Sequence, residues 1–177
     1  MPLRFRSLVV AVSFAAGLAG VEAQAATPEE EAGAAARQWA KAIMSRDVET
    51  QLKLLPKRLF VKPGEREREE KRLMHDKEVA AINGERYLSF DVQPKAILTG
   101  KVGNQLVLMF PYRSVVQTRD AKLQRDSSLI AIAEEGSSSW SVIDGTAQNP
   151  KSMRIYLPGY AGNPPVPRAV TKALAPG

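Results

Sequence analysis

The spacing of apolar residues changes near Tyr87 from a period typical of helices to one typical of strands. Before this point apolar side chains recur every three or four residues, whereas over residues 87–93 they alternate with polar ones. The alternation places Leu88, Phe90 and Val92 on one face of a strand and Asp91 on the other. Helices that precede strands in this way predict an α+β fold, with two or three N-terminal helices packed over a curved antiparallel sheet of four to six strands.

The first predicted helix begins at Thr27. Thr27 and Glu30 form a capping box, and Pro28 stands at the first helical position, where its missing N–H is harmless. The apolar stripe that follows has helical spacing and consists of Ala32, Ala35, Ala36, Trp39 and Ile43. Trp39 and Trp140, which lies on the last predicted strand, are interpreted as anchors of the core rather than as ligand-stacking residues.

Two further helices are predicted before the sheet. Asp47 can cap a short helix that Pro56 limits in length. Residues 65–72 then alternate in charge, with pairs three and four positions apart that support a helix exposed to solvent. Gly84 is a natural stop for it.

The strands after Tyr87 are separated by short polar turns. Residues 106–118 form an apolar run in which Pro111 predicts an edge or a bulge, because proline cannot donate to a central ladder. Residues 119–126 are predicted to be a turn, and residues 128–133 and 139–143 two more strands. Turns this short favour an antiparallel meander. Residues 106–112 are apolar on both faces, which suits helices on one side and a partner or pocket on the other.

The N-terminus is typical of a signal peptide. Arg4 and Arg6 precede an uncharged apolar run over residues 7–20, and Ala23 and Ala25 are the small residues that a signal peptidase reads. The run is shorter than the roughly 18–20 residues of a membrane anchor. We therefore expect cleavage near Ala25 and a periplasmic or secreted protein without a membrane anchor.

The amino-acid composition excludes several kinds of catalytic and metal site. The chain has no cysteine, which excludes disulfides, thiol catalysis and thiolate metal sites, and its single histidine, His75, argues against an imidazole metal site. No cofactor and no metal are therefore expected. The basic excess lies mostly in the C-terminal segment, and it is too sparse for a nucleic-acid-binding surface.

The chain is expected to divide at residue 145. Residues 26–145 form one α+β domain, and residues 146–177 form a basic tail rich in proline and glycine. Its apolar residues 153–157 are predicted to dock on the sheet or cover its open end. From Pro164 onward the tail is predicted to be mobile.

Two stretches carry a resemblance to a known family. Residues 35–39 running into residues 45–48, and Trp140 to Gly145 after a small turn, resemble the opening helices and the closing strand of the nuclear transport factor 2-like superfamily. The resemblance covers roughly residues 30–145 and implies a cone, in which N-terminal helices pack across a strongly curved antiparallel sheet. Cystatin-like sheet-and-helix folds are the nearest alternative.

The resemblance also suggests where chemistry would occur. Family members that act as isomerases, cyclases or dehydratases use a carboxylate inside an apolar pocket, helped by a tyrosine or a protonated acid. In this sequence Asp91 and Asp144, with Tyr87 or Tyr112 nearby, are the weak candidates for those roles. Strand alternation favours the simpler interpretation that Asp91 lies on the solvent-exposed face and that Asp144 begins a turn.

The function that these observations favour is an exported soluble binding or interaction module of the bacterial envelope, without a catalytic site. Its partner would be an envelope protein or a small apolar ligand, and a homodimer through the sheet is a further hypothesis. The alternative is a cofactor-free enzyme of the isomerase or dehydratase type, or a small-ligand binder, that uses the interior of the cone. This alternative requires a pocket of about 300 Å³ or more with a buried acid.

Overall fold

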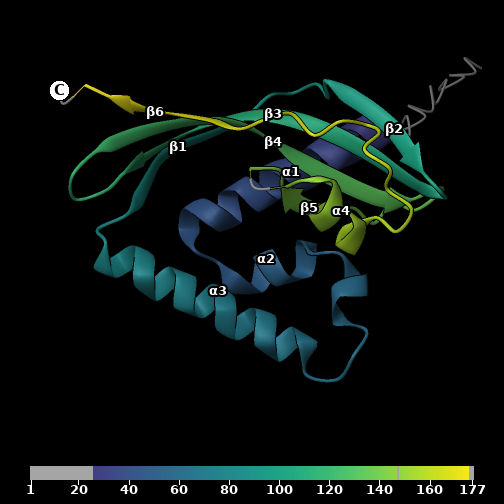
Figure 1. Ribbon diagram of the computed structural model, residues 1–177, viewed down its shortest axis with the longest axis horizontal. Coiled ribbons are helices and arrows are strands. Elements are labelled where there is room, and N and C mark those ends of the chain that lie inside the picture. Colours follow the sequence, from purple (N-terminus) through teal and green to yellow (C-terminus); the bar gives the residue numbers. More distant parts are fainter. Residues whose placement is uncertain (1–25, 147, 176–177) are drawn as a thin grey trace, which may run out of the picture.

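The computed structural model describes residues 26–146 and 148–175 and has an α+β fold, in which N-terminal helices pack on a strongly curled antiparallel sheet (Figure 1). The predicted fold class is therefore confirmed. The predicted signal peptide, residues 1–25, lies outside the described residues. Within the described part, none of the helices combines the length and the apolar character that crossing a membrane requires.

The sheet is built around one long hairpin. All thirteen residues of β3 pair with the thirteen residues of β4, and each of these two strands carries two short strands on its outer edge. β1 and β2 share the outer edge of β3, and β5 and β6 share that of β4. The strands are β1 Arg86–Val92, β2 Leu98–Val102, β3 Gln105–Gln117, β4 Lys122–Glu134, β5 Ser141–Asp144 and β6 Val170–Leu174.

The first three α-helices begin where the sequence predicts, whereas η1 and α4 were not predicted. Thr27 and Glu30 form the capping box of α1, with Pro28 at its first position, and Asp47 caps α2 by accepting the Thr50 N–H. Pro56 follows α2, and Gly84, with a positive φ of 63°, follows α3. The helices are α1 Pro28–Ser45, α2 Val48–Leu54, the 3-10 helix η1 Lys57–Phe60, α3 Glu65–Ile82 and α4 Pro150–Tyr156.

One face of the sheet, here called the inner face, packs against α1. Gly33 brings the α1 backbone close to the ring of Phe110, about 3.4 Å from where a Cβ would stand. Trp39 and Trp140 are both buried in this core, as predicted. The buried residues that form it are Ala32, Ala36, Trp39, Leu54, Leu108, Phe110, Tyr112, Leu129, Ala131, Ala133, Trp140 and Val142.

The opposite, outer face is covered by the chain's own C-terminal segment. Met153 and Leu157, on and just after α4, are fully buried there together with Tyr160. Their neighbours are the outer-face residues Val102, Val107, Met109, Ile130, Ile132 and Ile143. The second apolar face of residues 106–112, which the sequence assigned to a partner or a pocket, is thus covered by residues 153–160. The predicted docking of residues 153–157 is confirmed.

A β-bulge at the start of β1 changes which side chains point to the inner face, so the predicted orientation of Leu88 is corrected here. The register with β3 shifts between Tyr87 and Ser89, so Leu88 has no paired residue and its side chain is 41% exposed. Tyr87 takes the inner-face position instead, with its ring centroid 5.8 Å from that of Phe90. The prediction that Leu88 shares a face with Phe90 is therefore wrong, because one extra residue reverses the alternation.

The β3–β4 hairpin is longer than the sequence indicated. β4 begins at Lys122, so most of the predicted turn over residues 119–126 is strand. Pro111 lies in a central strand rather than on an edge or at a bulge. Its carbonyl accepts a hydrogen bond from the Gln93 N–H, just after β1 ends and before β2 begins. The missing N–H therefore faces a gap between two short strands, where no ladder bond is lost.

The end of the tail is not irregular. β6 pairs with β4 over residues 122–126, which contradicts the prediction that the chain is loose from Pro164 onward. Before β6, the hydroxyl of the buried Tyr160 donates to the carbonyl of Pro164, at 2.5 Å. This strand was not predicted, because its residues are mostly exposed and carry no apolar alternation.

Substitutions in the outer-face core test directly whether residues 153–157 dock on the sheet. We expect Leu157→Ala to lower the free energy of unfolding by about 2–5 kcal/mol, since it empties a fully buried site. Ile155→Ala, in the same segment but 58% exposed, should cost less than about 0.5 kcal/mol. Urea denaturation of both variants checks this, and equal losses would show that residues 153–157 do not dock as described.

Candidate functional site

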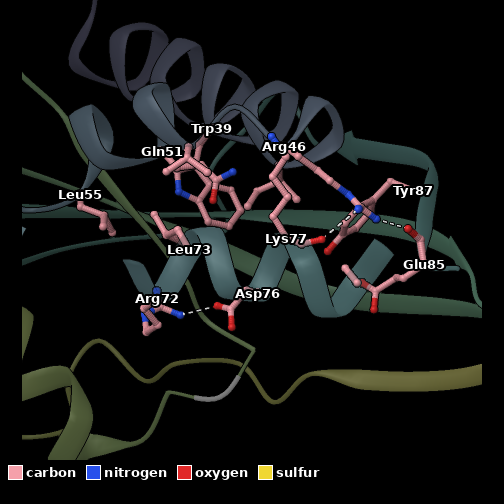
Figure 2. Close-up of a pocket in the computed structure, with 13 residues that line it drawn as sticks. Trp39, Arg46, Gln51, Leu55, Arg72, Leu73, Asp76, Lys77, Glu85 and Tyr87 are labelled. Atoms are coloured by element: carbon pink, nitrogen blue, oxygen red, sulfur yellow. Dashed lines mark hydrogen bonds and ion pairs between the residues drawn. The ribbon is translucent and has the colours of Figure 1, made fainter. Parts of the chain in front are cut away.

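A cleft lies between α3 and the body of the protein, where α1, α2, the start of β1 and the end of β5 border it. It comprises two cavities of about 280 Å³ and about 610 Å³. Trp39, Leu55 and Arg72 line both cavities, so the two are neighbours. Figure 2 shows the smaller cavity, with Trp39 of α1 and Leu73 of α3 on opposite sides.

The cleft exists because α3 does not pack closely on the body of the protein. None of its residues is buried, in agreement with the exposed helix that the charge pattern predicted. Arg72 bonds to Glu69 and Asp76 along the helix, which supports α3 locally without apolar packing. Leu73 and Ala80 line the cavity as its apolar contribution. A helix of this composition cannot seal the sheet and so leaves space beneath it.

Arg46 fixes the far end of α3. It caps α1 in the left-handed conformation, with φ 56°, and its guanidinium donates to the carbonyls of Lys77 and Glu85 (Figure 2). One side chain thus joins the end of α1, the last turns of α3 and the start of β1. The break at residues 45–47 was visible in the sequence, but the role of Arg46 was not, because both its partners are backbone carbonyls.

Tyr112, a residue of the inner-face core, contacts Asp144, which lines the larger cavity. The Tyr112 hydroxyl lies 3.2 Å from Asp144 Oδ1 and 2.8 Å from Thr146 Oγ1. Thr146 donates both its N–H and its hydroxyl to Asp144 Oδ1, at 2.8 and 2.6 Å. Asp144 lines the larger cavity, where its carboxylate is half-buried.

Gly145 makes this arrangement sterically feasible. Its N–H bonds to the Ser128 carbonyl at 2.9 Å, and a Cβ at this position would stand 2.7 Å from the same oxygen. The chain after β5 can therefore press against β4 and turn Thr146 back onto Asp144.

The other predicted candidates lie in different places. Asp91 is exposed and pairs in register with Arg113 on the outer side of the sheet, as the solvent-exposed interpretation predicted. Tyr87 lines the smaller cavity, where burial raises the pKa of its hydroxyl. His75 is exposed on α3. Across residues 26–146 and 148–175, no cluster of three or more acidic or histidine side chains could hold a metal ion.

Comparison with known protein families, with curated proteins and with solved structures finds no match to this chain.

The buried phenol of Tyr112 predicts that the stability of the folded protein depends on pH in the alkaline range. Burial, with the charge of Asp144 as the second cause, raises the pKa of Tyr112 to about 12 from an ordinary value of 10.0. The folded protein therefore holds this proton more tightly than the unfolded chain. Its contribution to stability is complete below about pH 10 and is lost as the pH rises through about 12. Tyr112→Phe should make the loss of stability between these values shallower.

Denaturation at a series of alkaline pH values tests this expectation. Tyr156→Phe is the matched control, because its hydroxyl makes no hydrogen bond within the described part of the chain. Ultraviolet titration should show one phenol fewer ionising near pH 12 in Tyr112→Phe. Identical alkaline stability curves for wild type and Tyr112→Phe would contradict the expected environment of Tyr112.

Proposed function

We propose that this protein is an exported binding module of the bacterial envelope, with a nuclear transport factor 2-like cone, that holds a small amphipathic ligand in the cleft beneath α3. The observation that carries the proposal is the larger cavity, about 610 Å³, between α3 on one side and β5 with α4 on the other. Small-molecule sites are clefts of about 300–1,000 Å³ with mostly apolar walls and a few placed polar groups. Trp39, Leu55 and Tyr156 supply apolar walls, and Asp144 with charged side chains of α3, among them Arg68 and Arg72, supplies polar groups.

Export and the family are parts of the same proposal. The basic start, the apolar run over residues 7–20 and Ala23 and Ala25 support export to the periplasm. The curled antiparallel sheet with helices packed on its inner face is compatible with the cone of the proposed family. An envelope protein that delivers or accepts the ligand is the partner that fits this role.

A cofactor-free enzyme is the second candidate, and the contact between Tyr112 and Asp144 favours it. A carboxylate in contact with a phenol is a pair of groups that an isomerase or dehydratase would use, although only Asp144 lines the larger cavity. However, the Asp144 carboxylate already accepts hydrogen bonds from Tyr112 and Thr146. A base held by several donors is better suited to orienting a ligand than to removing its proton.

The two tryptophans allow a test of ligand binding in the cleft. Trp39 lines both cavities, whereas Trp140 is buried in the same core and lines neither. Since the chain has only these two tryptophans, Trp140→Phe leaves Trp39 as the sole reporter and Trp39→Phe leaves Trp140. The probe is 10-bromo-1-decanol, a neutral amphipathic molecule whose bromine quenches tryptophan fluorescence at short range, and 1-decanol is its non-quenching control.

We expect saturable quenching in Trp140→Phe and much weaker quenching in Trp39→Phe. Displacement of the brominated probe by 1-decanol should restore the fluorescence of Trp39. Absence of saturable quenching in both folded variants, or equal quenching in the two, would overturn the proposed site.

A further inference from the structure

A row of residues crosses the inner face where the sheet extends past α1. The register places Phe90 opposite Ser114, Ser114 opposite Arg125, and Arg125 opposite Thr171. Directly opposed residues of antiparallel strands point to the same face. Arg125 therefore lies on the inner face, in the middle of the row, between β3 and β6.

Arg125 has no partner in the described part of the chain. It is half-buried, yet within residues 26–146 and 148–175 its guanidinium makes neither an ion pair nor a side-chain hydrogen bond. Arg113, on the adjacent strand but on the outer face, bonds to Asp126 at 2.7 Å. Removing a charge from water without a partner costs free energy, so an unpaired arginine on an inner face is unusual.

Ser114 provides a second, independent observation. Its side chain is 1% exposed, and its hydroxyl lacks a hydrogen-bond partner among the described residues. Buried hydroxyls are nearly always bonded, and an unbonded one calls for an explanation such as an absent ligand or water. This hydroxyl stands directly beside Arg125 in the register.

The row adjoins the cleft beneath α3. Glu85 lines both the smaller cavity and a recess of about 60 Å³ that holds Arg125 and Thr171. Tyr87, another wall of the smaller cavity, pairs with Val116, the next inner-face residue after Ser114. Burial raises the pKa of the Tyr87 hydroxyl, and the positive charge of Arg125 is the largest effect in the opposite direction.

The charged groups near Arg125 do not pair with it, so its guanidinium can bind a ligand. Arg46, the other guanidinium at this end of the cleft, is held by the carbonyls of Lys77 and Glu85. The Asp144 carboxylate is held by Tyr112 and Thr146. The Glu85 carboxylate shares the recess but forms no ion pair with Arg125.

We propose that the cleft binds a single-chain amphipathic monocarboxylate, with its carboxylate on Arg125 and its apolar body along Trp39, Leu55 and Leu73. This inference rests on the proposed function, since it names the class of ligand that the cleft takes. A guanidinium matches the planar carboxylate with two parallel N–H donors, and the hydroxyls of Ser114 and Thr171 stand on either side. The apolar side chains of Trp39, Leu55 and Leu73 favour a ligand with an apolar chain over a small free carboxylate.

The test compares two ligands that differ only in the head group. Dissociation constants of decanoate and 1-decanol are measured at neutral pH by displacement of 10-bromo-1-decanol from the Trp140→Phe protein. Without a further substitution, decanoate should bind about tenfold to a hundredfold more tightly than 1-decanol, the range expected for hydrogen bonds to a charged group. Arg125→Gln should abolish this preference, and Arg125→Lys should retain part of it.

Arg113→Gln is the matched control, because it removes the same charge from the other face of the neighbouring strand. It should leave the preference for decanoate unchanged. Unchanged 1-decanol binding by Arg125→Gln shows that this variant is folded. Equal affinities for decanoate and 1-decanol, or a preference that survives Arg125→Gln, overturn the assignment of Arg125 while leaving the proposed cleft in place. Failure of both ligands to bind overturns the proposed function itself.

Discussion

The structure depends on covering both faces of the β3–β4 hairpin. Residues at alternate positions, such as Leu108 and Met109, are buried on opposite faces, so neither face can be left to solvent. The N-terminal helix α1 covers the inner face and residues 153–160 cover the outer one. The two ends of the described chain therefore stabilise one hairpin from opposite sides, and the C-terminal segment is part of the core rather than an appendage.

The cleft follows from what α1 leaves uncovered. Beyond α1 the inner face is mixed, with the polar Ser114, Arg125 and Ser127 beside the apolar Val116. α3 extends beneath this region but has no buried residue, and the Arg46 side chain ties its C-terminal part to the body. A partly polar surface beside a loosely packed helix is a suitable place for an amphipathic molecule, because such a molecule can contact both polar and apolar groups.

Local features were predictable from sequence, and features that depend on long-range register were not. The Thr27 capping box and the change of period at Tyr87 act within a few residues, and both are confirmed. The bulge at Leu88 was missed, because one inserted residue changes the facing without changing the composition. Arg125 was missed because it stood in a predicted turn, and only the pairing of β4 with β3 and β6 places it on the inner face. Tyr112 and Asp144 were predicted as candidates from their residue types alone. Their contact was not predicted, because it joins residues 32 positions apart and depends on the register across β4.

The central claim is that α3 lies over a ligand-binding cleft and is held far less firmly than the sheet. Hydrogen–deuterium exchange with mass spectrometry tests it most directly, because amides in helices without buried contacts open locally. Residues 65–82 should exchange much faster than residues 105–117 and 122–134, and saturating decanoate should slow exchange in residues 65–82 selectively. Protection of α3 equal to that of β3 and β4, unchanged by decanoate, would contradict the account.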